Sequence, residues 1–136
     1  MLGALFPQSI KRGARFADGI SAFSFGPTFE DVAEKFELAR AAWREAKRPK
    51  PPRLATGFWF ALGTNGREQM GTYLERYLKF MGESAGRNLL PHCTAISPEG
   101  VREALKICRD AGAEEVVLSP TTTDPDEVHR LADLIG

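Results

Sequence analysis

The feature that most constrains the fold of this chain is a four-fold alternation of strand-like and helix-like segments. Four apolar runs, each followed by a helical pattern of apolar residues, predict strands at residues 2–5, 20–25, 54–62 and 115–119. Strands that alternate with helices pair in parallel through right-handed crossovers. The alternation therefore predicts an α/β fold built from four parallel β-α units.

The helices between these strands begin at clear sequence signals. Thr28 with Asp31 three residues later predicts a capped helix over residues 29–47. Ser97-Pro98-Glu99 supplies a cap, a first-turn proline and a first-turn acid for a second helix. A third apolar stripe is expected to run from Met70 to Met81. In the last helix, opened by residues 124–127, the inward residues are expected to be Val128, Leu131, Ala132 and Ile135.

The length of the chain sets the size of the sheet. A complete eight-stranded α/β barrel needs about 250 residues, and this chain has 136, with its first strand directly after Met1. We therefore interpret residues 1–136 as a single segment, half of a TIM-like (β/α)8 barrel. A flavodoxin-like open sheet has the same periodicity, so the pattern leaves both architectures open.

Charge and composition exclude several classes of protein. Lys and Arg together number 18, as do Asp and Glu, so no basic excess indicates nucleic-acid binding. No apolar run approaches the roughly 18 residues of a membrane span, and no signal peptide is evident. Cys93 and Cys108 lack metal-ligand spacing and are expected to be reduced thiols in a cytoplasmic protein.

Ligands of both architectures bind at the carboxyl ends of the strands, which selects the loops at residues 6–9, 26–28, 63–66 and 120–124. The first is the best phosphate candidate, because Gly3 and Ala4 carry little bulk and Gln8 and Ser9 add donors. The alternative is that the small residues only permit tight strand–helix packing. Residues 121–123 are three threonines, and we favour their bonding to backbone groups over ligand contact.

Catalytic and metal-binding residues are not identified by these patterns. His129 is expected to be solvated on the last helix, and His92 is a weak catalytic candidate in an irregular segment. No histidine or cysteine pair has the spacing of a metal site. Residues 58–60 read Phe-Trp-Phe and either fill the core, the favoured interpretation, or wall a planar ring.

Two parts of the chain resemble the luciferase-like flavin-dependent oxidoreductases. Residues 2–20 carry the pattern G-A-x-x-P-x-x, a spacer, and A-x-x-A-D-G, here as Gly3-Ala4 through Pro7 to Asp18-Gly19. Residues 111–118 and 124–133 resemble the end of the same family. The resemblance implies a TIM-like barrel that uses FMN or the deazaflavin F420, with this chain as the C-terminal half, strands five to eight.

The resemblance also implies the position of the cofactor. The turn after the fifth strand of the family helps to hold the cofactor phosphate, and Ile20 on the next strand is expected near the ring. The residues expected near the phosphate are Gly3, Ala4, Leu5, Gln8 and Ser9.

The implied activity is that of an oxidoreductase or monooxygenase, with hydride transfer or oxygen activation on a reduced flavin-type cofactor. Because strands one to four are absent, the sheet is expected to close by pairing with a second copy or a second half-barrel subunit. Two alternatives stay open: a non-catalytic cofactor-binding or assembly subunit, and a truncated gene product without an independent role. The choice between FMN and F420, and the substrate, also stay open.

Overall fold

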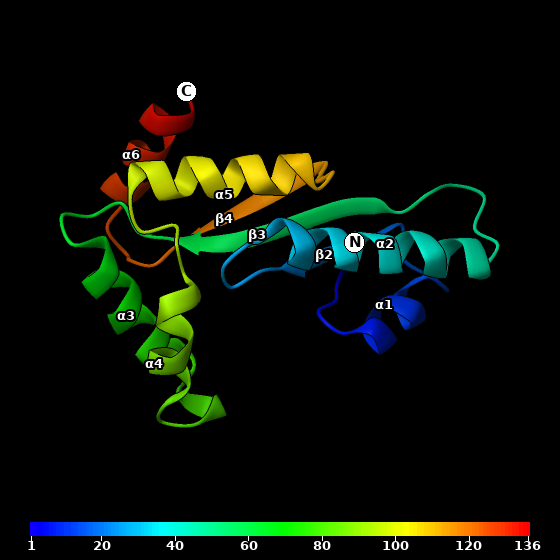
Figure 1. Ribbon diagram of the computed structural model, residues 1–136, viewed down its shortest axis with the longest axis horizontal. Helices are drawn as coiled ribbons and strands as arrows, with labels where there is room; N and C mark the ends of the chain where they lie inside the picture. The colour runs from blue at the N-terminus through cyan, green and yellow to red at the C-terminus, as the bar shows by residue number, and fades with distance from the viewer. The chain divides into compact units, whose positions relative to one another are not determined.

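The computed structural model describes residues 1–136, and Figure 1 shows the helices and strands along the chain. The four strands are β1 (Leu2–Gly3), β2 (Gly19–Phe23), β3 (Arg53–Phe60) and β4 (Glu115–Pro120). The α-helices are α1 (Pro7–Gly13), α2 (Phe29–Glu45), α3 (Gly66–Tyr77), α4 (Ala85–Leu89), α5 (Pro98–Asp110) and α6 (Asp126–Ile135). Two short 3₁₀ turns are η1 (Lys79–Met81) and η2 (Leu90–His92). None of the helices combines the length and apolar character that a membrane span requires.

The sheet has the strand order of a barrel wall. Its order is β1-β2-β3-β4, so each strand neighbours the next one along the chain. β1 pairs with β2 in parallel and β2 with β3 in parallel, with Ile20 opposite both Leu2 and Leu54. An open doubly wound sheet reverses its strand order at a switch point, whereas a barrel does not. The sequential order thus favours the predicted half-barrel over the flavodoxin-like alternative.

The chain forms two compact units. Unit 1 comprises residues 1–58 and 105–117, and unit 2 comprises residues 59–104 and 118–136.

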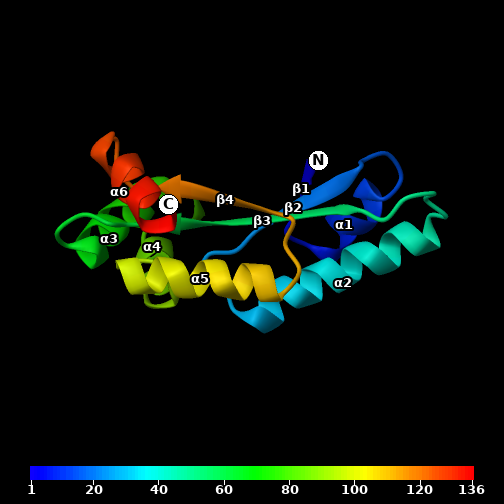
Figure 2. The same ribbon diagram turned by 90° about the horizontal axis from the view of Figure 1, so that it is seen from above.

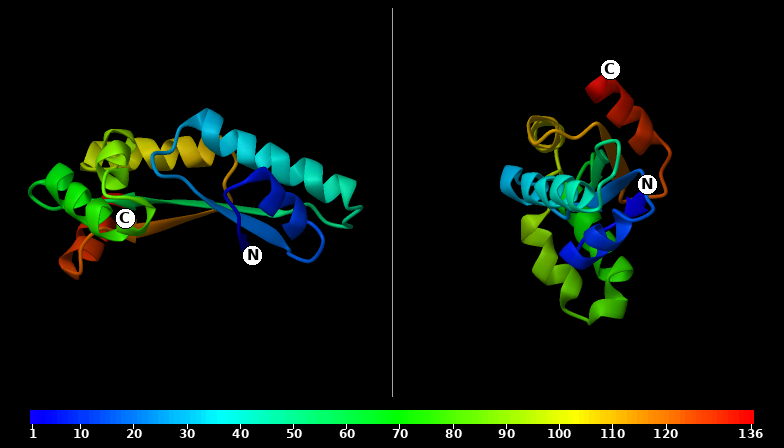
Figure 3. Two further views of the ribbon diagram at one scale, coloured as in Figure 1. Left: turned by 90° about the horizontal axis from the view of Figure 1, so that it is seen from below. Right: turned by 90° about the vertical axis from the view of Figure 1, so that its right-hand side faces the viewer.

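Unit 1 has an apolar core between its strands and the helices α1 and α2, which pack against each other (Figures 2 and 3). Ile20 and Ala22 alternate along β2, so both side chains point to the same, helix-covered side. They meet Ile10 of α1 and Phe36 of α2, both fully buried. The predicted cap of α2 is confirmed, because the Asp31 N–H donates to Thr28 Oγ1 at 3.2 Å.

The strand predicted at residues 54–62 ends two residues early, at Phe60. The Ala61 N–H donates to the Ala95 carbonyl at 2.9 Å instead of continuing the strand. The Leu62 N–H donates to a Glu127 carboxylate oxygen at 2.6 Å. Two hydrogen bonds from outside the sheet therefore redirect the backbone of unit 2 at this point.

Two expectations about helix faces are wrong. The stripe that starts at Met70 was expected to reach Met81, but α3 ends at Tyr77 and Met81 in η1 is 63% exposed. On α6, Val128 and Ile135 are exposed, whereas the acidic Glu127 is fully buried. Hydrogen bonds to the Glu127 carboxylate turn this side of α6 inward, which leaves the predicted apolar face outside.

In unit 2, α3 and α4 lie side by side and approach closely at Gly86 (Figure 1). A Cβ at position 86 would lie 2.7 Å from the Glu75 nitrogen and 2.8 Å from the Leu74 carbonyl oxygen. Both are backbone atoms of α3, so a side chain at Gly86 could be accommodated only by separating the two helices.

We expect Gly86→Ala to lower the free energy of unfolding by about 1–3 kcal/mol, the usual cost of overpacking. The matched control is Gly71→Ala in α3, whose added Cβ would meet only a side-chain carbon of Leu90 at 3.3 Å. Alanine in a helix interior is favoured over glycine by roughly 0.5–1 kcal/mol, so the control should be neutral or stabilising. Urea denaturation of both variants measures the difference, and equal effects would contradict the close approach.

Candidate functional site

The loop after β1 brings together five of the six predicted cofactor residues. Gly3 ends the strand, and a Cβ built on it would meet no atom within 4 Å. Ala4 is buried, and its N–H donates to the Ser21 carbonyl at 3.1 Å. Leu5 is 37% exposed and leads through Phe6 to α1. The loop therefore presents exposed backbone at Gly3 beside a helix start.

The first turn of α1 carries the two predicted donors. No side chain caps this helix, whose first residue is Pro7. Ser9 is half-buried, whereas Gln8 is exposed and lines a shallow cavity of about 320 Å³ with Lys11, Arg12 and Arg15. Uncapped first-turn N–H groups and nearby cations both favour an anion.

Ile20 is the predicted residue that does not join this loop. Its side chain is fully buried in the core of unit 1, on the helix-covered side of β2. Its neighbour Ser21, opposite Gly3 in the register, points to the other side of the strand. A contact between Ile20 and a cofactor ring stays a prediction.

Unit 2 holds a cavity that we call the strand-end pocket. It has a volume of about 650 Å³ and lies where β3 and β4 lead into α3 and α6. Its lining is rich in hydroxyl, amide and charged groups. The lining residues are Asn65, Glu68, Gln69, Thr72, Tyr73, Arg76, Pro120, Thr121, Thr122 and Thr123.

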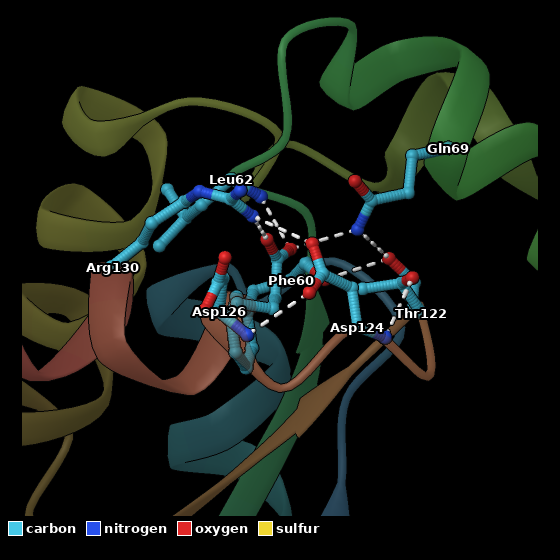
Figure 4. A network of polar contacts seen from close by, with 9 residues as sticks. Phe60, Leu62, Gln69, Thr122, Asp124, Asp126 and Arg130 are labelled. Atoms are coloured by element: carbon cyan, nitrogen blue, oxygen red, sulfur yellow. Dashed lines mark hydrogen bonds and ion pairs between the residues drawn. The ribbon is translucent and has the colours of Figure 1, made fainter.

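A polar network that includes Gln69 of this pocket (Figure 4) centres on the buried carboxylate of Glu127. One carboxylate oxygen accepts from the Leu62 N–H at 2.6 Å and from Gln69 Nε2 at 2.7 Å. The other accepts from Arg130 Nη1 at 3.0 Å. The hydrogen bond that Arg130 donates to Glu127, together with the nearby charge of Asp124, raises the pKa of Arg130 above its ordinary value. The network ties the β3 end, α3 and α6 together.

The threonines at the end of β4 bond to the protein itself. Thr121 Oγ1 donates to the Phe60 carbonyl at 2.8 Å and accepts from Gln69 Nε2 at 3.0 Å. Thr122 Oγ1 accepts from the Asp124 N–H at 3.2 Å. The favoured interpretation of these hydroxyls, bonding to backbone groups, is confirmed for Thr121 and Thr122. Thr123 is exposed at the pocket.

Aromatic residues stand beside the same pocket. Trp59 packs edge-on against Tyr73 and Tyr77, with ring centroids 5.6 and 5.4 Å away, and the two tyrosines stack at 5.5 Å. Burial and the neighbouring Tyr77 raise the pKa of Tyr73. Phe58 and Phe60 are fully buried, which confirms that these two aromatic residues of β3 fill the core.

Sequence reasoning missed Glu127 and Gln69. An acid in the first turn of a helix is expected to be solvated and to complement the helix dipole, and a glutamine on α3 carries no distinguishing pattern. Only the tertiary fold buries this carboxylate. His92 and His129 are both exposed, and no group of three or more His, Cys, Asp or Glu side chains is arranged to hold a metal ion.

The chain matches no family model and no curated protein, but it is similar to several solved structures. One is an F420-dependent secondary alcohol dehydrogenase in complex with an F420-acetone adduct, with 13% identity, a TM-score of 0.62 and 91% of this chain covered. Another is the coenzyme F420-dependent tetrahydromethanopterin reductase from Methanopyrus kandleri, with 13% identity, a TM-score of 0.61 and 98% covered. The monooxygenase RslO1 from Streptomyces bottropensis has 20% identity, a TM-score of 0.58 and 98% covered.

These likenesses show the fold. This chain spans 43, 47 and 44% of the three chains, so it corresponds to less than half of each. The predicted α/β half of a TIM-like barrel is thereby confirmed. The resemblance to luciferase-like enzymes is supported at the level of the fold.

We expect Glu127→Gln to lower the free energy of unfolding by about 2–4 kcal/mol, because it removes a buried charge that accepts three hydrogen bonds. Asp126→Asn is the matched control, since it removes an equal charge from an exposed position in the same turn of α6. Thermal and urea denaturation measure both variants. A loss no greater in Glu127→Gln than in the control would contradict the network.

Burial raises the pKa of the Cys93 thiol and of the Cys108 thiol to about 11. At pH 8 roughly 0.1% of each thiol is then ionised, so we expect Ellman's reagent to label neither cysteine in the folded protein and both in urea.

The folded pKa of each thiol lies above the unfolded value of about 8.5. The resulting stabilisation is complete below pH 8.5 and is lost as the pH rises toward 11. Rapid labelling of folded protein at pH 8 would refute this.

Proposed function

We propose that this chain is the C-terminal half, strands five to eight, of a luciferase-like barrel that works as an F420- or flavin-dependent oxidoreductase. The observation that carries the proposal is the similarity of nearly the whole chain to half of F420-dependent enzymes and of a monooxygenase. The loop after β1 adds independent support, because its residues suit an anionic group at the carboxyl end of a strand.

The geometry of this loop fits a cofactor phosphate. The space above Gly3 is open to an approaching group, and α1 begins without a side-chain cap. In the proposal, backbone around Gly3, Ala4 and Leu5 and the donors of Gln8 and Ser9 hold the phosphate. These residues would bind and orient the cofactor.

The flavin or deazaflavin, when bound, supplies the electron chemistry of hydride transfer or oxygen activation. The protein's contribution would be to fix the position of the ring and to exclude water from it. In the strand-end pocket, Tyr73 and Arg76 supply a partly buried phenol and a cation that could orient a polar substrate.

The second half of the barrel would come from a second copy of this chain or from another half-barrel. Support for this comes from the 43–47% coverage of the similar structures and from the two unpaired outer strands, β1 and β4, of the four-stranded sheet. Parallel edges left open are prone to pair with another chain.

A non-catalytic cofactor-binding or assembly subunit is the second candidate. It is favoured by the two unpaired outer strands of the sheet, β1 and β4, which a partner would have to complete. Turnover of bound cofactor by a chemical or enzymatic reductant would separate an enzyme from such a subunit.

The first experiment is native mass spectrometry and equilibrium dialysis of the full chain with F420 and with FMN. We expect a dimer that binds one of the two cofactors. Gly3→Val should weaken binding by about tenfold or more, because the side chain would occupy the space needed by the phosphate.

Ser84→Val is the matched control, since it places the same side chain at an exposed position outside both sites. Circular dichroism should show that both variants remain folded. A folded Gly3→Val protein that binds as tightly as the original chain would contradict the phosphate site. Failure of the original chain to bind either cofactor, alone or as a dimer, would contradict the proposed function.

A further inference from the structure

One face of α1 carries a concentrated positive charge. Gln8, Lys11 and Arg12 lie in α1 at the spacing i, i+3, i+4, which places them along one side of the helix, and Arg15 follows in the turn after Gly13. All four are exposed, and together they line the cavity of about 320 Å³. We call this set the α1 basic stripe.

The cations of the stripe have no acidic partner. Neither Lys11 nor Arg12 nor Arg15 forms an ion pair with a carboxylate, a property that they share with other exposed cations such as Arg67 and Lys79. Residues 7–17 contain three cations and no acid, in a chain with zero formal net charge. One acid, Glu45, lines a neighbouring cavity together with Lys11 and Arg15.

The helix that carries the stripe is held firmly from its other side. Ile10, Gly13, Ala14 and Ala17 are buried, and Ile10 and Ala14 pack in the core with α2. The Arg48 guanidinium also donates to the Ala14 carbonyl at 3.2 Å. The three cations therefore project from a fixed base, where like charges in adjacent turns repel one another.

The positions of these cations also have a simpler explanation, and the test must distinguish it from ligand binding. Lys11 and Arg12 lie in the last turn of α1, where cations are stabilised by the helix dipole. That effect, however, does not require a cavity lined by the cations, nor the absence of every acid from the helix. Helices α2, α3, α5 and α6 carry both signs of charge.

We infer that the α1 basic stripe binds a small molecule with two or more adjacent phosphate groups. Gln8 to Arg12 span roughly 6 Å along the axis of α1, and Arg15 extends the stripe into the following turn, so the stripe is longer than one phosphate group needs. Two arginines supply planar, bidentate donors for phosphate oxygens, and Lys11 adds a point charge. The inference shares Gln8 with the proposed cofactor-phosphate loop, but its three cations do not belong to the predicted cofactor residues.

The test is isothermal titration of the full chain with inorganic pyrophosphate and, separately, with orthophosphate. We expect pyrophosphate to bind about tenfold or more tightly than orthophosphate, and its affinity to fall as salt is raised. The variant Lys11→Gln/Arg12→Gln/Arg15→Gln should lose about tenfold or more in pyrophosphate affinity. It should also remain as stable as the original chain without ligand, because the repulsion between the cations is removed.

The matched control is Arg67→Gln/Lys79→Gln/Arg102→Gln, which removes three exposed cations of unit 2 and changes the net charge equally. Its pyrophosphate affinity should stay within about twofold of the original. An equal loss in the control, or equal affinities for the two anions, would overturn the inference. Destabilisation of the stripe variant without any pyrophosphate binding by the original chain would assign the cations to the helix dipole.

A measurement on the unaltered chain tests the same site without depending on whether a variant folds. Pyrophosphate should shift the backbone amide resonances of residues 8–15 in a ¹⁵N spectrum and leave those of residues 67–79 unchanged. Shifts spread evenly over the chain, or absent from residues 8–15, would refute the site. If a single-stranded oligonucleotide binds more tightly than pyrophosphate, the inference of a small ligand is wrong and the stripe binds nucleic acid instead.

Discussion

The buried carboxylate of Glu127 is the interaction on which the organisation of unit 2 depends. It accepts hydrogen bonds from the Leu62 backbone, from Gln69 and from Arg130, and thereby joins the end of β3 to α3 and α6. A buried charge is costly unless it is fully paired, so its three donors must all be in place at once. This requirement holds the chain just after β3 against α6, and it fixes Gln69, which lines the strand-end pocket.

Unit 1 is organised by apolar packing instead. Ile20 and Ala22 on β2 face Phe36 of α2 and Ile10 of α1, and nonpolar burial holds these elements in place. Such packing leaves the opposite side of α1 and the loop after β1 exposed. The exposed positions, Gly3 in the loop and the α1 basic stripe, are those for which we propose anionic ligands, because the rigid core fixes their geometry without using their polar groups.

The similarity to structures more than twice as long gives the exposed apolar residues a common explanation within our proposal. Val128 and Ile135 on α6 were expected to be buried, and both are exposed. The similar structures extend well beyond the part that this chain matches. A helix that flanks an outer strand of a half-barrel has neighbours on one side only, so part of its apolar surface would be covered by the completing half.

The sequence alone determined the α/β class, the order of the β-α units and the caps at Thr28 and Ser97, because these follow from local periodicity and hydrogen bonds between near neighbours. It also placed Gly3, Ala4, Leu5, Gln8 and Ser9 together, since they are adjacent in the chain. Only the tertiary structure decided that Ile20 faces the helices, that Met81 is exposed and that Glu127 is buried. These outcomes depend on partners far away in the sequence: Glu127 lies 65 residues from Leu62, and no local pattern encodes such a contact.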